Sequence, residues 1–303
     1  MSYEQYPGYF RVSTVADSVA RLESDSLMFV GATWSSQRAI EISSELLSGV
    51  ISPDVEKWLM HNEGKDALEY LSSDWYSGAI KAGATRKQQA AADRGTIVNL
   101  VWDGMNRGEV LKTKDVIDYA IELMHERSIE AKLSQQEYRE AVELGLVDIK
   151  DKSKKPVRNY QCDEEEVANY VAALACWYRD CPWRHLESQR FMVDEKKKVV
   201  GTFDDLGYWG EQKVIADLKT STSKQPKLYN VVQSAQYWHM AGADRSIRPM
   251  NIIVTPEGVY PRLLSDQGIK TGLKHFDNAL EILKTASMKG LFLTTNESAV
   301  KIA

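Results

Sequence analysis

Two apolar runs separated by a glycine turn, within residues 199–220, constrain the fold of this chain more than any other segment. A two-residue turn at Gly210 and Glu211 would join the runs as a β-hairpin, in a register that places Asp204 opposite Asp217. Directly opposed side chains on one face of a hairpin lie only ~4.5 to 5.5 Å apart, and like charges there repel. The sequence therefore predicts a positive charge close to these two acids.

Lys219 supplies such a charge, because alternate residues of a strand share a face and Lys219 follows Asp217 by two positions. Leu218 then points into the core, and its backbone carbonyl adds a neutral oxygen. This set of oxygen ligands suits Mg²⁺ or Mn²⁺, which also bind substrate phosphate. A plainer alternative is a surface turn in which Lys219 only pairs with Asp217, but the apolar residues around the acid disfavour it. A longer turn would shift the register and leave the shared face of Asp217 and Lys219 intact.

The chain has 303 residues, of which 43% are apolar, enough for one large core with insertions or for two domains. No apolar stretch approaches the ~18 residues that span a bilayer, and residues 1–13 do not resemble a secretion signal. We therefore expect no membrane partner and a cytoplasmic protein, in the host cytoplasm if the source is viral. The three cysteines fit no metal pattern and predict reduced thiols.

The net charge of −5 offers nucleic acid no general attraction, so any such contact requires a local basic groove. Clusters that could form one, although each alone is more typical of a solvated surface, are Arg86, Lys87 and Arg94, then Lys152, Lys154, Lys155 and Arg158, and finally Lys224 and Lys227.

Apolar periodicity predicts a mostly helical first part, residues 1–185, followed by a compact unit of strands and helices, residues 186–303. Helices are expected at 34–48, 54–72, 82–106, 114–128, 134–146 and 164–180, and later at 226–243 and 269–288. Strands are expected at 186–194, 197–206, 212–219, 250–255 and 258–264, with a turn at Gly258. Residues 82–106 are interpreted as the first core helix, 107–185 as a helical insertion, and 148–158 as a loop.

The order helix, three strands, helix, strand resembles the PD-(D/E)xK nuclease superfamily, above all the branch of the RecB nuclease domain and the mitochondrial genome maintenance exonuclease. The residues that carry the resemblance are Glu187 before the first strand, Gly201-x-x-Asp204, Asp217-x-Lys219-Thr220 and Gln233-x-x-x-Tyr237. The resemblance implies an α/β fold with a restriction-endonuclease-like core, a central mixed sheet flanked by helices, to which a large helical N-terminal part and an insertion are added.

Arg94, Gly95 and Thr96 resemble the start of this branch's Arg-Gly-Thr-x-x-His helix, but Asn99 stands where the branch has histidine. An amide offers only a neutral oxygen, which makes a weaker metal ligand. This departure puts a second metal, or full activity, in doubt. Asp103, four residues further along the same helix face, could compensate in part.

The resemblance implies a metal-dependent DNA exonuclease that hydrolyses phosphodiester bonds of single strands or DNA ends in recombination, repair or phage DNA metabolism. Asp204 and Asp217, with the Leu218 carbonyl, would hold Mg²⁺ or Mn²⁺; Glu187 would ligate it directly or orient a water; Lys219 would position the attacking water. Nucleic-acid contacts are expected from Gln233, Tyr237, Arg94, Thr96 and Asn99. Trp183 and Trp209 are candidates for base stacking.

Two alternatives stay open. A DNA-end-binding protein that has lost catalysis would account for Asn99, whereas a structure-specific endonuclease would cut a closed single-stranded circle. A lid built by the helical insertion would favour threading of DNA ends. A recombination or single-strand-binding protein would be a plausible partner for such an enzyme.

Overall fold

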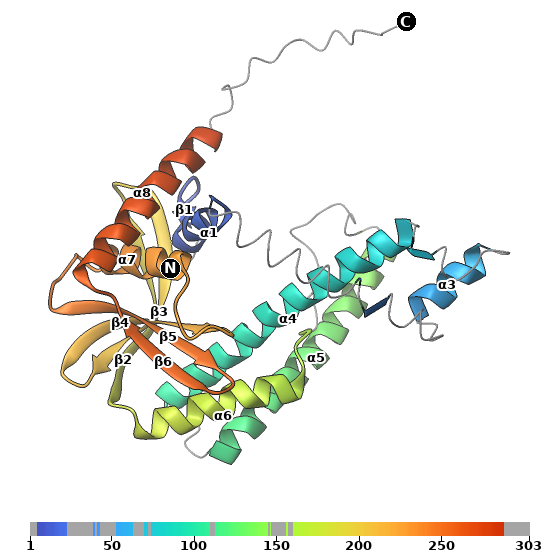
Figure 1. Ribbon diagram of the computed structural model, residues 1–303, viewed down its shortest axis with the longest axis horizontal. Helices are drawn as coiled ribbons and strands as arrows, with labels where there is room; N and C mark the ends of the chain where they lie inside the picture. The colour runs from blue at the N-terminus through green and yellow to red at the C-terminus, as the bar shows by residue number, and fades with distance from the viewer. Residues whose placement is uncertain are drawn as a thin grey trace, which may run out of the picture.

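The computed structural model describes residues 5–22, 39, 41–42, 53–62, 70–71, 74–109, 113–144, 146, 156 and 160–287. The fold is α/β, with a central mixed sheet flanked by helices (Figure 1). Its strands are β1 (Phe10–Arg11), β2 (Trp183–Asp194), β3 (Val199–Trp209), β4 (Gln212–Thr220), β5 (Ile247–Thr255) and β6 (Gly258–Leu263). Its helices are α1 (Val12–Leu22), α3 (Pro53–His61), α4 (Asp74–Asn106), α5 (Thr113–Glu143), α6 (Glu164–Asp180), α7 (Leu228–Met240) and α8 (Asp266–Ser287).

The strands are ordered β1-β3-β4-β5-β6, and β2 pairs with the opposite edge of β3. The β4–β5 and β1–β3 pairs are parallel, and the other pairs are antiparallel. Because parallel neighbours require a crossover, α7 connects β4 to β5 across one face of the sheet.

The β3–β4 hairpin has the predicted turn and register. Trp209 pairs with Gln212, Gly210 has a φ of 62°, and the ladder continues to the pair Asp205 and Ala216. The ladder stops there, one step before Asp204 and Asp217 would pair. Further along the same edge of β3, β1 pairs with residues 199–200. Residues 201–204 of β3 therefore lie between two strand partners and pair with neither on that edge.

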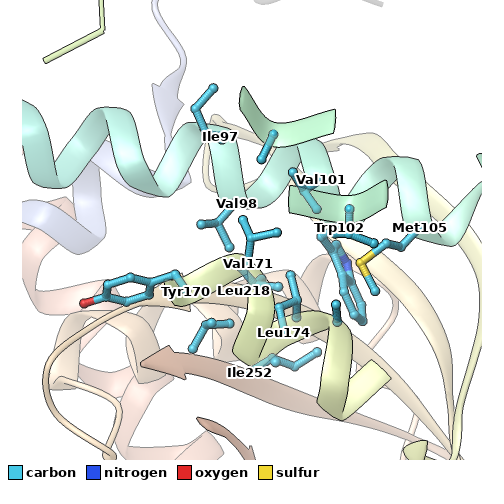
Figure 2. Close-up of a cluster of buried hydrophobic side chains, with 14 of the residues drawn as sticks. Ile97, Val98, Val101, Trp102, Met105, Tyr170, Val171, Leu174, Leu218 and Ile252 are labelled. Atoms are coloured by element: carbon cyan, nitrogen blue, oxygen red, sulfur yellow. The ribbon is translucent and has the colours of Figure 1, made fainter. Parts of the chain in front are cut away.

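Two hydrophobic cores cover the two faces of the sheet. The first joins α4, α5 and α6 to β4 and β5 through residues such as Val98, Trp102, Leu174, Leu218 and Ile252 (Figure 2). The second joins α1, α7 and α8 to β2, β3 and β4 and contains Phe203, Ile215, Tyr237 and Phe276. Since Leu218 faces the first core and Ile215 the second, strand alternation places Asp217 and Lys219 on the α7 side.

Helix α1 and strand β1 were not predicted, and both belong to this second core. Val12, Val15, Ala16 and Val19 recur at helical spacing and are buried against α7 and α8. Residues close to the start of the chain therefore complete the layer that faces Asp217.

Several predicted boundaries were wrong. The helices expected at 114–128 and 134–146 form the single helix α5, because the residues between them are good helix formers without glycine or proline. Helix α4 begins at Asp74, ahead of the expected residue 82, and runs through Gly78 and Gly83. Pro226 precedes α7, which begins at Leu228.

Other predictions fall partly or wholly on residues outside the described ranges. They include most of the helix at 34–48, the second half of the helix at 54–72, and the loop at 148–158 apart from Pro156. Among the described helices, none is both long and apolar enough to cross a membrane.

Candidate active site

The two acids of the hairpin lie close together where β3 and β4 cease to pair. Asp204 is half-buried, and its Oδ2 accepts a hydrogen bond of 3.2 Å from the backbone N–H of Leu218. The acid on β3 therefore reaches β4 through its side chain, although the expected strand pair of Asp204 with Asp217 does not form. The break in the ladder leaves the Leu218 N–H available for this bond.

Asp217 and Lys219 form an ion pair beside Asp204, with 2.9 Å between Lys219 Nζ and Asp217 Oδ1. The Asp217 carboxylate is buried, and its Oδ2 has no hydrogen-bond partner. Burial raises the pKa of Asp217, and the negative charge of Asp204 adds to the rise, while Lys219 opposes it. An ionised carboxylate at this position therefore calls for one more positive charge.

Lys219 holds its proton firmly. Burial by itself would lower the pKa of this ammonium group, but the carboxylates of Asp217 and Asp204 outweigh burial and raise it. Lys219 is therefore an ammonium ion in the neutral pH range and offers N–H donors to a water or an oxygen anion.

Tyr237 and Gln233 of α7 lie on the same side of the sheet. Tyr237 is buried, its hydroxyl accepts a 3.3 Å hydrogen bond from Gln233 Nε2, and burial raises its pKa, with further contributions from Asp217 and Asp204. A β-carbon at Gly201 would lie 2.7 Å from the Tyr237 ring. Glycine at this position therefore lets the tyrosine approach β3 next to the acids.

One face of α4 lies along the other side of the site. A β-carbon at Gly95 would lie 3.3 Å from the Thr220 hydroxyl, which shows how close this helix comes to the end of β4. Burial and the nearby charge of Asp204 raise the pKa of Asp103 to about 6. Asn99, half-buried, stands between Gly95 and Asp103 on this face.

Two further predicted contacts lie on the same helix. Arg94 is buried, donates to the Glu166 carboxylate and lies over the Tyr170 ring, 4.5 Å from its centroid. Thr96 is exposed, and its hydroxyl donates to the Ala92 carbonyl of its own helix. Arg94 therefore anchors α4 to α6, while Thr96 remains at the surface.

Glu187, on β2, has an ion pair of its own. Its carboxylate lies 3.5 Å from the Arg190 guanidinium, and its side chain is 44% exposed. A register shift between His185 and Glu187 interrupts the pairing of β2 with β3 at this point. In the described part of the chain, no three His, Cys, Asp or Glu side chains gather as a ready-made metal group.

The residues present nevertheless fit a magnesium-like ion. Mg²⁺ is commonly held by one or two carboxylates and completes its shell with water and substrate phosphate. Asp204 and Asp217 supply the carboxylates, and the buried, unpartnered Oδ2 of Asp217 is an oxygen that a cation would satisfy.

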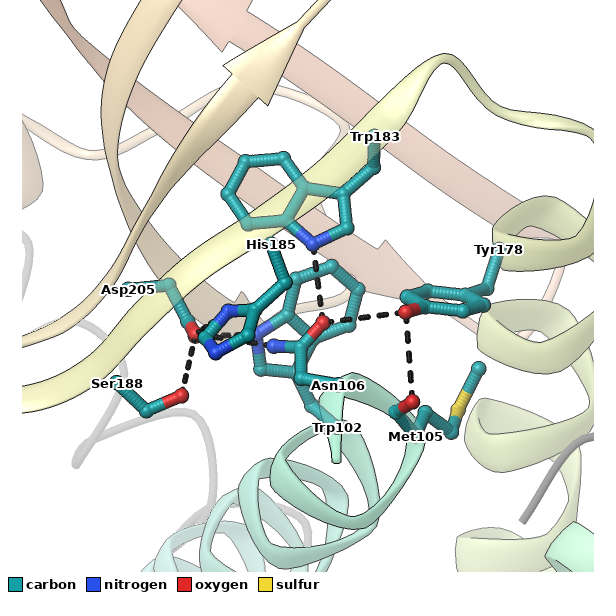
Figure 3. A network of polar contacts seen from close by, with 8 residues as sticks. All are labelled: Trp102, Met105, Asn106, Tyr178, Trp183, His185, Ser188 and Asp205. Carbon is teal, nitrogen blue, oxygen red and sulfur yellow. Dashed lines mark hydrogen bonds and ion pairs between the residues drawn. The ribbon is translucent and has the colours of Figure 1, made fainter. Parts of the chain in front are cut away.

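Asp205, the residue after Asp204, is a buried acid that the sequence analysis missed. Figure 3 shows its carboxylate accepting hydrogen bonds from the side chains of Trp102, Asn106 and Ser188, with His185 beside it. Burial raises the pKa of Asp205 to about 8. The sequence did contain a signal for this residue. In the predicted hairpin register Asp205 lies opposite Ala216, and strand alternation places it on the face of β3 that packs into the core.

The two tryptophans proposed for base stacking lie in an aromatic cluster at the tip of the hairpin. Trp209 stacks on Trp177, with ring centroids 5.6 Å apart, and Trp183 Nε1 donates to Asn106 Oδ1 at 2.9 Å. Both residues are partly buried and pack against the first core.

Comparisons with known proteins give no family for this chain. No protein-family model and no curated protein matches it. A solved structure described as the crystal structure of SSO0001 is similar over 39% of this chain and 57% of its own length, at 15% identity and a TM-score of 0.23. The chain thus spans a little over half of that protein, and a TM-score this low does not relate the two folds.

Proposed function

We propose that this chain is a divalent-metal-dependent deoxyribonuclease of the PD-(D/E)xK type, which degrades single-stranded DNA or DNA ends. One observation carries the proposal: two carboxylates and a protonated lysine converge where a hairpin opens, and one carboxylate oxygen is buried without a partner. Acids brought together in this way are unfavourable unless a cation compensates them.

Each residue has a role that its surroundings support. Asp204 and Asp217 would hold Mg²⁺ or Mn²⁺, which supplies a Lewis acid for the phosphoryl oxygens and activates water. Lys219 stays protonated beside them and would orient the attacking water and stabilise negative charge on the phosphate. Asp103 would add a carboxylate from α4. Gln233 and Tyr237 would contact the DNA strand from α7.

The test is cleavage of end-labelled single- and double-stranded DNA with Mn²⁺ or Mg²⁺. We expect products that disappear with EDTA and in Asp217→Asn, a change that preserves shape and removes charge. Glu211→Gln is the matched control, because Glu211 is an exposed carboxylate on the same hairpin and should keep full activity. Equal activity of the two variants would refute the assignment of Asp217.

A DNA-end-binding protein without turnover is the second candidate, favoured by Asn99 and by the lack, among the described residues, of a third acid grouped with Asp204 and Asp217. It predicts tight binding of labelled ends and no products with either metal. Cleavage of a covalently closed single-stranded circle would instead indicate an endonuclease of the same fold, since an end-dependent enzyme leaves the circle intact.

A further inference from the structure

A cavity of about 320 Å³ lies beside Lys219, enclosed by α4, the end of β4 and the start of α7. Its polar wall contains three cationic side chains, from Arg94, Lys219 and Lys227, and the three hydroxyl residues 220–222. None of the residues lining it is acidic. Such a wall is suited to an anion that accepts several hydrogen bonds.

The start of α7 opens into this cavity. No side chain caps the helix at Lys227, and the hydrogen bonds of its first turn begin with the Asn230 N–H, which donates to the Lys227 carbonyl at 3.0 Å. The N–H groups of Leu228 and Tyr229 precede that bond and have no partner within the helix. The positive end of the helix dipole adds to the attraction for an anion.

Two buried polar groups of the cavity lining lack partners. Arg94 is 8% exposed and Asn230 is 4% exposed, yet neither Arg94 Nε nor Asn230 Oδ1 has a hydrogen-bond partner. A buried polar atom without a partner costs free energy, and the Arg94 Nε–H is a donor that an anion, directly or through a water, would satisfy. Arg94 belongs to α4, so its unpartnered N–H is independent of the α7 terminus, whereas Asn230 lies in the first turn of α7 and its Oδ1 requires a donor such as water.

The charges of two of the three cations are already partly balanced. Arg94 pairs with Glu166 and Lys219 with Asp217, whereas Lys227 has no ion pair within the described residues and is exposed. Removing the charge of Lys227 should therefore weaken ligand binding more, and destabilise the fold less, than removing either of the other two cations.

We propose that this cavity binds a phosphate group of the DNA strand, adjacent to the phosphate held at Asp204 and Asp217. The substrate class rests on the proposed function. Lys219 connects the two positions, because it lines the cavity and also contacts Asp217. The phosphate is either a terminal monoester, which would set the end of the strand, or an internal diester, which would set the path of the strand.

The experiment measures binding of fluorescein-labelled single-stranded DNA by anisotropy, with EDTA present to prevent cleavage. The variant is Lys227→Gln, and Lys274→Gln is its matched control: it makes the same change at an exposed lysine of α8 that lies outside the cavity lining. We expect Lys227→Gln to bind on the order of threefold to tenfold more weakly and to lose about one unit of the salt slope. Lys274→Gln should match the wild type.

Oligonucleotides with a 5′-phosphate, a 3′-phosphate or neither separate the two sources of phosphate. A terminal site predicts that the effect of Lys227→Gln appears only with one phosphorylated end. An internal site predicts the same effect on all three strands. Either result supports the cavity.

Equal binding by Lys227→Gln, Lys274→Gln and the wild type would overturn the proposal, as would equal weakening in both variants. The phosphate site and the nuclease assignment can be refuted independently of each other. If Lys227 matters for binding and no metal supports cleavage, the phosphate site stands and the nuclease assignment falls. If the DNA is cleaved and Lys227 has no effect on binding, the reverse holds.

Discussion

Asp205 and Asp204 are adjacent residues with opposite surroundings. Asp204 is half-buried, whereas Asp205 is enclosed by the side chains of α4 and β2 and has a pKa of about 8 because of burial. Between the ordinary carboxyl pKa and this value, the folded protein binds a proton that the unfolded chain has released. The contribution of Asp205 to stability is therefore present at low pH and is lost as the pH rises toward 8.

This loss of stability with rising pH should be measurable. Unfolding in urea should require less free energy at pH 8 than at pH 5.5, with a slope for Asp205 of at most about 1.4 kcal/mol per pH unit. Asp205→Asn removes the titrating group and should flatten this dependence. Asp103, with its pKa raised to about 6, should leave a smaller slope in the same direction. A wild-type stability that stays level or increases over this range would contradict the prediction.

Gly201 is a residue whose missing side chain shapes the site. A β-carbon there would lie 2.7 Å from Tyr237 Cε1 and 2.9 Å from Val12 Cγ2. Gly201→Ala should therefore destabilise the fold by about 1 to 3 kcal/mol, as expected for overpacking in a core, and displace Tyr237 from the acids. Urea denaturation measures the first effect and DNA cleavage the second.

Gly268→Ala is the control for that change, because a β-carbon at Gly268 would meet its neighbours at no less than 3.4 Å. We expect Gly268→Ala to leave stability and cleavage close to those of the wild type. Similar losses in both variants would show that the cost is a general one of replacing glycine.

At the scale of elements, α6 connects the helical layer to the first long strand and begins with a well-formed cap. Asp163 Oδ1 accepts from the N–H groups of Glu165 and Glu166 at 2.9 and 3.1 Å. Asp163→Ala should lower the free energy of unfolding by about 0.5 to 2 kcal/mol. Glu165→Ala, which removes an exposed carboxylate from the same turn without removing the cap, should cost less. Comparing the urea unfolding curves of the two variants shows whether the lost stability comes from the cap hydrogen bonds or from the carboxylate charge.

The elements that sequence predicted well are those with a strong local pattern. The glycine turn at Gly210 determined the hairpin register, and the apolar spacing of α6, α7 and α8 located these helices within a few residues. The α/β fold with a mixed sheet was implied by the family resemblance that this order of elements carries, and the structure has such a fold.

What the sequence did not predict depends on contacts between distant segments. Strand β1 has only two residues, so its pairing with Val199 and Val200 has no local signal. The end of the β3–β4 ladder at Asp205 and Ala216 changes how Asp204 meets Asp217, and nothing in the hairpin sequence marks that point. The register shift between His185 and Glu187 in β2 is likewise a tertiary effect without a local signal.

At the scale of the whole molecule, a bound metal should stabilise the fold, because only the folded chain brings Asp204 and Asp217 together. A ligand at 100 times its dissociation constant adds about 2.7 kcal/mol. We expect Mn²⁺ to raise the melting temperature of the wild type relative to EDTA and to have no such effect on Asp217→Asn. Glu211→Gln should respond as the wild type does. An equal Mn²⁺ response in all three proteins would place the ion elsewhere.

The pairing of β1 with β3, and the packing of α1 on α7 and α8, also has a consequence for how the chain is made. Residues 12–22 are made before α7 and α8, yet these helices bury their apolar side and end at Met240 and Ser287. During translation the apolar side of α1 therefore stays uncovered until α8 has been made. The layer that faces Asp217 is then completed only after α8 has folded onto α1 and α7.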